Sequence, residues 1–343
     1  MTDSKRIPYI DFLRFIGITL IILAHVNAPD ILIQIRCFDV PLMLFVSGLS
    51  YANKDVSNMN WTKWMIKRLK RLIIPVWLYL LFFFIVYSLL LHVGIVSFTY
   101  SRVEVIGSFS LLTGRSIGFV WIYRVFILIM LVTPLLLRFH QKLSNIGFVV
   151  FFVALIIFNE FLIDVALPDI QGYKAIHYVM MQVIPYILGY SVPFLLGVRL
   201  YNCTQKETLY YSIFIFVVFV FASISYYFKD GQWCHFHPFY KYPPKFFFII
   251  YGLFVCSFLW LIRNKIKDVS RFGLVGFVGS NTTWIYLFHI LFVILARIYI
   301  NHWMIRFVVV YTLSIFVYAA WYHIIKRIID KDNNIPLIKY LIG

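Results

Sequence analysis

Ten apolar segments of membrane-spanning length recur along the chain, separated by short stretches rich in polar residues, proline or glycine. A run of about 20 apolar residues is long enough for a helix to cross the hydrocarbon core of a bilayer. The pattern therefore predicts an all-α, polytopic transmembrane helical bundle of about ten spans, forming a single domain over residues 1–343. The spans are predicted at residues 8–28, 37–53, 72–93, 117–137, 146–164, 179–198, 209–228, 246–262, 274–296 and 305–325.

The composition indicates that lipid is the main solvent of this chain. Of the 343 residues, 62% are hydrophobic and only 13% are charged, whereas a soluble domain carries about 25% charged residues. One water-exposed core cannot bury so many apolar side chains, so much of the surface must face lipid. This excludes an ordinary soluble enzyme or binding domain.

The net charge of +17 leaves the predicted fold unchanged and bears only on how the protein is oriented in the membrane. A basic surface can indicate nucleic-acid binding, but in a membrane protein Lys and Arg gather in cytoplasmic loops. With the N-terminus in the cytoplasm, roughly twice as many Lys and Arg residues fall in cytoplasmic loops as outside them. We therefore expect both termini in the cytoplasm, and membrane lipid rather than nucleic acid as a partner.

The first predicted span contains three ionisable residues, Asp11, Arg14 and His25. Asp11 and Arg14 are one helical turn apart, so their side chains can pair. Arg14 and His25 are separated by about three turns, so they share the same stripe and lie roughly 16 Å apart along the axis. A charge at this depth costs several kcal/mol unless it faces protein or water. The stripe should therefore face the bundle interior.

Two interpretations of this stripe are open. A structural ion pair and a packed histidine explain it without any chemistry. Inside a membrane, however, buried ionisable residues commonly mark a functional site. In that case His25 can act as a general base near neutral pH, and Arg14 can hold an anion or keep a carboxylate charged.

Five segments in a fixed order resemble the acyltransferase family 3 membrane proteins, whose first span carries an Arg, ten intervening residues and a His. The first is the stripe itself, with Asp11 as the acidic residue before Arg14. The other four are Val40–Tyr51 with its Ser-Gly pair (Ser47, Gly48), Lys67–Tyr79 with Arg68, Arg71 and Pro75, Tyr242–Pro244, and Ser280–Ile290 with Tyr286 and His289. The resemblance covers essentially the whole chain. Arg124, in the fourth span, departs from the expected pattern and has no assigned role.

The resemblance implies a multi-pass protein of the bacterial plasma (inner) membrane that takes an acyl group, usually acetyl, from cytoplasmic acyl-CoA. The acceptor would be a hydroxyl of a surface glycan or of its lipid-linked precursor. Acetyl-CoA is then the expected donor, and the enzyme would be a membrane-bound O-acyltransferase.

The same resemblance suggests roles for the candidate residues. In the predicted loop from Trp61 to Arg71, we expect Lys67, Arg68 and Arg71 to hold the CoA phosphates, since Arg–phosphate contacts can be bidentate. The alternative is a cluster that only sets topology and touches anionic lipid headgroups. His25 would deprotonate the acceptor hydroxyl or carry the acyl group, and Arg14 with Asp11 would fix the geometry.

Several further residues have two interpretations. His289 has either a second catalytic or orienting role or a packing role, and Tyr286 and Tyr242 are expected to bind substrate. Ser47 beside Gly48 is expected to pack helices. Cys234, His235 and His237 lie too close together for a usual zinc site, so no metal is predicted, and the Tyr-rich segment that follows can stack on sugar rings. The cysteines, Cys37, Cys203, Cys234 and Cys256, show no disulfide pattern.

The main competing function is a proton-coupled transporter or flippase of lipid-linked sugar, because buried Arg and His also suit proton-coupled transport. Such transporters commonly have two related halves with interrupted spans, and no such symmetry is visible in this sequence. A glycan polymerase would need a larger outer loop than the longest one predicted here, and a non-enzymatic scaffold would not explain the buried stripe.

Overall fold

The computed structural model describes residues 7–52, 59–111, 115–166, 174–231, 233, 235–236, 238–266, 273–331 and 341. Within these ranges all regular secondary structure is helical, which confirms the predicted all-α class. The longer helices are α1 (Pro8–Ala24), α3 (Asp39–Tyr51), α4 (Trp61–His92), α6 (Trp121–Lys142), α7 (Asn145–Phe161), α9 (Ile184–Tyr201), α10 (Gln205–Asp230), α11 (Phe246–Leu261), α13 (Thr282–Tyr299) and α14 (Trp303–Lys331). The short elements are α2 (Asp30–Ile35), η1 (Arg36–Phe38), α5 (Arg102–Phe109), η2 (Leu162–Ala166), α8 (Lys174–Gln182), η4 (Ile262–Asn264) and α12 (Gly273–Ser280).

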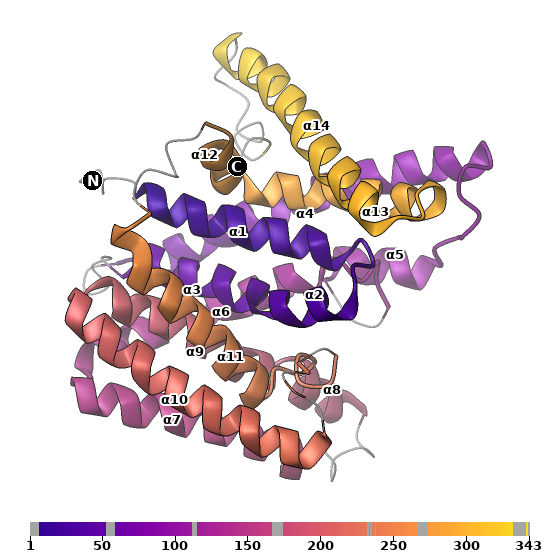
Figure 1. The fold of residues 1–343 in the computed structure, drawn as a ribbon. Coiled ribbons are helices and arrows are strands. Elements are labelled where there is room, and N and C mark those ends of the chain that lie inside the picture. Colours follow the sequence, from indigo (N-terminus) through magenta and orange to yellow (C-terminus); the bar gives the residue numbers. More distant parts are fainter. Residues whose placement is uncertain are drawn as a thin grey trace.

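The ten predicted spans all correspond to helices of the structure. In the described part of the chain, nine helical segments are long and apolar enough to cross a membrane. The remaining predicted span is α1, which has 17 residues and runs through the middle of the bundle (Figure 1). Together, α1 and the nine segments make a multi-pass membrane protein.

Three differences from the predicted boundaries affect residues of interest. The helix α4 begins at Trp61, so the basic segment predicted as a loop is helical; the Asn60 side chain caps it by accepting from the Lys63 backbone N–H at 3.0 Å. Helix α1 ends at Ala24, so His25 is its C-cap. The ninth span is broken at Asn281, whose amide donates to the Phe277 carbonyl and so competes with the helical hydrogen bonds.

The centre of the bundle is the contact between α3 and α9. A Cβ added to Gly48 would lie 2.0 Å from the Phe194 carbonyl oxygen, and one added to Gly197 would lie 2.1 Å from the Phe45 oxygen. The two glycines therefore let the backbones approach more closely than any side chain would permit, which is the usual form of tight helix packing in membranes. The close helix contact beside Ser47, for which the packing role was predicted, is thus made by Gly48.

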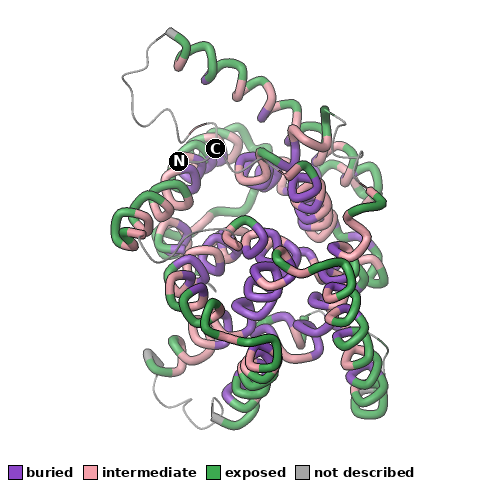
Figure 2. The backbone as a smooth tube through the Cα atoms, turned by 90° about the vertical axis from the view of Figure 1, so that its left-hand side faces the viewer, coloured by how far each residue is buried: buried purple, intermediate pink, exposed green. Residues whose placement is uncertain are grey.

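Burial follows this arrangement. Figure 2 shows buried residues concentrated in the middle of the bundle and exposed residues around its outside. On the peripheral helices α10 and α14 the exposed residues include Phe221, Phe228, Val308 and Phe316, as expected for surfaces that face lipid tails. The ionisable residues of α1 lie on the inner side, where α1 contacts α3, α12 and α13.

Candidate functional site

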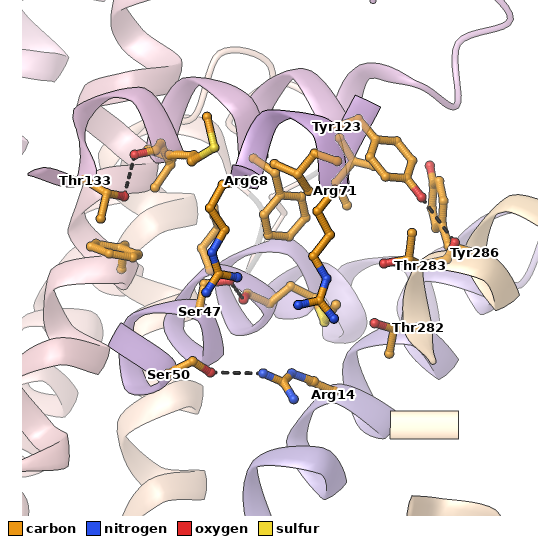
Figure 3. A pocket seen from close by; sticks show the side chains of 18 of the residues that line it. Arg14, Ser47, Ser50, Arg68, Arg71, Tyr123, Thr133, Thr282, Thr283 and Tyr286 are labelled. Carbon is orange, nitrogen blue, oxygen red and sulfur yellow. Dashed lines mark hydrogen bonds between the residues drawn. The ribbon is translucent and has the colours of Figure 1, made fainter. Parts of the chain in front are cut away.

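The two predicted donor-binding arginines, Arg68 and Arg71, meet Arg14 of the α1 stripe in one cavity. The cavity has a volume of about 270 Å³ and is lined by α1, α3, α4, α6, α9 and α13. Arg68 and Arg71 extend from α4 toward Arg14 of α1 (Figure 3). We call this space the arginine cavity. Three guanidinium groups in one cavity make it strongly electropositive.

The contacts of Arg14 hold it at the edge of this cavity. Its Nη1 donates to Asp11 Oδ1 at 3.0 Å, which confirms the predicted pair. Its Nη2 donates to the Ser50 hydroxyl on α3, also at 3.0 Å (Figure 3). Asp11 is 4% exposed, so a buried carboxylate fixes a guanidinium whose side chain is still 31% exposed.

Arg68 and Arg71 differ from Arg14 because they keep their charge available. Arg68 stacks over the Tyr51 ring, with the guanidinium carbon 5.3 Å from the ring centroid. Among the described residues, no carboxylate pairs with Arg68 or Arg71. Both charges can therefore bind an anion that enters the cavity.

A second, smaller cavity of about 100 Å³ contains His25. Its lining includes Trp121 and Tyr242 together with three charged residues, Arg36, Asp39 and Lys241. We call this space the histidine cavity. Ile21, Ile122 and Tyr286 line both cavities, so these three side chains form a common collar between the arginines and His25.

The hydrogen bonds of the two histidines determine which nitrogen of His25 is available. His289 is fully buried, and its Nδ1 contacts the Tyr286 carbonyl oxygen. A carbonyl only accepts, so His289 Nδ1 carries the proton, and the Nε2 of the neutral ring is an acceptor. His25 Nδ1 lies 3.0 Å from this Nε2 and must donate to it. The Nε2 of His25 then has a free lone pair.

The end of α1 that carries His25 is held by two arginines. Arg297 donates to the His25 carbonyl oxygen through Nε at 3.0 Å and Nη2 at 2.7 Å. Arg306 donates to the Val26 carbonyl oxygen at 2.8 Å. Cationic groups satisfy the last carbonyls of a helix and oppose its dipole. Arg297 and Arg306 thus fix the backbone at His25.

A buried charged cluster forms one wall of the histidine cavity. Asp39 Oδ1 accepts from Lys241 Nζ at 3.2 Å and from the Val40 backbone N–H at 2.8 Å. Its other oxygen pairs with the Arg36 guanidinium. Burial lowers the pKa of the Lys241 ammonium, and the neighbouring Asp39 carboxylate opposes that shift.

The comparison with known protein families decides what kind of protein contains these cavities. A family model described as an acyltransferase domain matches residues 7–324. The chain belongs to acyltransferase family 3. No curated protein and no solved structure matches the sequence. Family membership together with the multi-pass architecture supports acyl transfer at a membrane.

The remaining predicted site residues of this acyltransferase fall into two groups. Tyr286 lines both cavities and donates its hydroxyl to the Phe119 carbonyl, while Tyr242 lines the histidine cavity beside Trp121. Lys67, in contrast, is exposed and does not line the arginine cavity. Ser47 does line it, although its hydroxyl donates to the Met43 carbonyl.

Arg124, which has no assigned role from the sequence, contacts two neighbouring helices of the acyltransferase. Its guanidinium stacks over the Tyr186 ring at 4.9 Å, and its Nη2 donates to Gln182 Oε1 at 3.2 Å. It therefore ties α6 to α8 and α9. The sequence motif Cys234–His235–His237 lies partly outside the described residues, since Cys234 and His237 are not described; the part of the chain that is described contains no group of three metal ligands.

Arg36, Asp39, Lys241 and Arg297 were not identified as site residues from the sequence. One pattern could have indicated the first two: Arg36 and Asp39 are three residues apart in an apolar context, the same spacing that made Asp11 and Arg14 a candidate pair. For Lys241 and Arg297 no local pattern existed. Their neighbours in space, Asp39 and His25, are far away in sequence.

Proposed function

We propose that this acyltransferase moves an acyl group, most simply acetyl, from acyl-CoA to a hydroxyl of a surface glycan or its lipid-linked precursor. The donor would occupy the arginine cavity, and the acceptor hydroxyl would enter the histidine cavity. The observation that supports this most is the collar of Ile21, Ile122 and Tyr286, which both cavities share. A donor held on one side can therefore present its thioester to a base on the other.

The arginine cavity suits the donor because acyl-CoA combines phosphates with a long, flexible arm. Arg68 and Arg71, without carboxylate partners among the described residues, supply charge for the phosphates. Beyond them the lining is mostly apolar, with Ile18 and Phe126 among its residues. The roughly 16 Å between Arg14 and His25 along α1 is the distance that the thioester arm would have to span.

The histidine cavity suits the transfer step. In direct transfer, His25 Nε2 takes the proton of the acceptor hydroxyl while its oxygen attacks the thioester carbonyl carbon. The carbon–sulfur bond then breaks, and the imidazolium proton passes to the leaving thiolate. In an acyl relay, the same Nε2 attacks the thioester carbonyl carbon, and the carbon–sulfur bond breaks to release the CoA thiolate. The acceptor hydroxyl then attacks the acyl-imidazolium, the carbon–nitrogen bond breaks to restore the neutral imidazole, and the hydroxyl proton passes to the thiolate. Both routes depend on the lone pair that the His25–His289 hydrogen bond leaves at Nε2.

The orientation of the enzyme follows from its charges. With both termini in the cytoplasm, the basic N-terminal part of α4 would face the cytoplasm, where acyl-CoA is found. The histidine cavity would then lie toward the opposite face of a bacterial plasma membrane, where surface glycans are assembled.

The test is acetyl transfer by the purified protein in lipid nanodiscs, with radiolabelled acetyl-CoA and lipid-linked or polymeric glycan. His25→Ala should reduce transfer by about 10²-fold or more, because general-base catalysis contributes about that much. His323→Ala changes an exposed histidine on α14 and should leave transfer unchanged. Wild-type transfer by His25→Ala would remove His25 from the chemistry.

The same preparation separates acyl transfer from transport. A transporter or flippase of lipid-linked sugar would move a fluorescent lipid-linked sugar between leaflets without acyl-CoA. Buried ionisable residues along connected cavities are compatible with that activity. Failure of the wild-type protein to bind or consume acetyl-CoA, with leaflet exchange intact, would favour transport.

A further inference from the structure

The charged wall of the histidine cavity contains more positive than negative charge. Arg36, Asp39 and Lys241 are 4%, 1% and 2% exposed, so water solvates none of them well. With both basic groups charged, two cations face one carboxylate. Isolated charges are costly to bury, and natural proteins pair them. The two cations share the Asp39 carboxylate, and the Lys241 ammonium also lies over the Tyr242 and Phe248 rings, 5.7 and 5.9 Å from their centroids. Among the described residues the cluster contains no second carboxylate to balance the second positive charge.

The hydrogen bonds of the cluster are also incomplete. Arg36 uses Nη1 to contact Asp39, but its buried Nε has no hydrogen-bond partner among the described residues. Lys241 Nζ has three protons and, within the same part of the chain, makes one hydrogen bond, to Asp39. Both side chains line the histidine cavity. The cavity therefore offers unused donors and an unbalanced charge side by side.

The charge near His25 increases this excess. Arg297 and Arg306 bond only to backbone carbonyls, and no ion pair joins either of them to an acid of the described residues. These cations lie at the opposite end of α1 from Arg14. The usual preference of Lys and Arg for the cytoplasmic side does not account for them.

We propose that the histidine cavity recognises an anionic acceptor, whose carboxylate or phosphate oxygens bind Arg36 and Lys241 while its hydroxyl faces His25. This inference rests on the proposed function, because it assigns the acceptor to that cavity. A carboxylate would belong to an acidic sugar, and a phosphate to a phosphorylated or lipid-linked one. In either case the oxyanion balances the charge of the cluster and accepts its unused hydrogen bonds.

The proposal can be tested by ligand-induced stabilisation of the purified full-length protein in nanodiscs. The probes are glucuronate, glucose 1-phosphate and the neutral methyl glucoside, at constant ionic strength. A ligand that binds the folded protein raises its thermal unfolding midpoint by mass action. At least one of the two anions should raise the midpoint, and the neutral sugar should require a much higher concentration.

Two variants remove the excess charge in independent ways. Lys241→Gln leaves an Arg36–Asp39 pair, and Arg36→Gln leaves a Lys241–Asp39 pair, so both clusters are balanced. Each should weaken anion binding by about tenfold or more, whereas Lys241→Arg should retain it. Lys245→Gln is the matched control, because Lys245 follows in the same segment but pairs with Asp164 outside the cavity.

The outcomes distinguish an acidic sugar from a phosphorylated acceptor, and they test the anion site separately from the acyl-transfer function. Stabilisation by glucuronate alone indicates an acidic sugar, and stabilisation by glucose 1-phosphate alone indicates a phosphorylated acceptor. Stabilisation by neither anion, or equal stabilisation of wild type and both Gln variants, would overturn the anion site. Binding of acetyl-CoA is measured in the same samples; its loss with anion binding intact would count against the acyl-transfer function and leave the anion site standing.

Discussion

At the scale of single residues, the site depends on hydrogen bonds that specify a protonation state. The Tyr286 carbonyl fixes the proton of His289, and His289 in turn fixes that of His25. These two hydrogen bonds hold His25 in one tautomer, as an orienting group does for a catalytic histidine. Arg297 adds a second restraint by holding the His25 carbonyl. In the proposed mechanism His289 is therefore a positioning residue, which acts through His25.

We expect His289→Ala to reduce kcat for acyl transfer by roughly 10²-fold, since small misplacement of a reacting group can cost that much. The KM for acyl-CoA should change little, because His289 does not line the arginine cavity. Steady-state kinetics in nanodiscs measure both. A large rise in the KM with an unchanged kcat would instead indicate a role in donor binding, and His92→Ala, at an exposed position of α4, controls for general effects.

At the scale of elements, one face of α4 differs from the rest of its basic segment. Arg68, Arg71 and Leu72 line the arginine cavity, with the i, i+3, i+4 spacing of a single helix face. Lys67 and Lys70 are exposed and lie outside it. The structure thus separates basic residues that line the cavity, to which we assign the proposed donor binding, from basic residues of the same segment that lie outside it.

We expect Arg68→Ala and Arg71→Ala each to weaken acyl-CoA binding by about tenfold or more, as for the loss of a charge-assisted hydrogen bond. Lys67→Ala removes the same charge from the same helix but outside the cavity, so its effect should be small. Titration calorimetry with a non-hydrolysable acyl-CoA analogue measures the affinities. Equal losses in all three variants would indicate a general effect of positive charge on this helix.

At the scale of the whole molecule, the bundle brings residues from opposite ends of the chain into one pair of cavities. α1 lies between α3 on one side and α12 and α13 on the other (Figure 1). The stripe of α1 therefore faces helices that begin more than 250 residues later. The two cavities lie along α1, with Arg14 lining one and His25 lining the other. The proposed donor and acceptor sites are therefore at different positions along this helix.

The orientation of this bundle can be tested by labelling single cysteines with an impermeant maleimide, in a background where the native cysteines are replaced by serine. Lys63→Cys, at the start of α4, should react in inside-out vesicles, because the basic segment is expected in the cytoplasm. Arg102→Cys, at the start of α5, should react in right-side-out vesicles. The reverse pattern would invert the topology and contradict a cytoplasmic donor site.

The sequence by itself determined the helical class, the spans and the α1 stripe. These depend on local quantities, namely the length of apolar runs and the spacing of residues on one helix, which follow from helix geometry alone. The pairing of Asp11 with Arg14 belongs here too, since both residues are on the same turn. The five ordered motifs added the family, which the match over residues 7–324 bears out.

Only the tertiary structure decided what the stripe faces. The meeting of Arg14 with Arg68 and Arg71, the contact of His25 with His289, and the joining of Asp39 to Lys241 all depend on how distant helices pack. No local pattern encodes such contacts, because packing in a membrane is set by close backbone approach, as at Gly48 and Gly197, rather than by spacing along one helix. The balance of charge beside His25, and with it the inferred anionic acceptor, could be determined only from that packing.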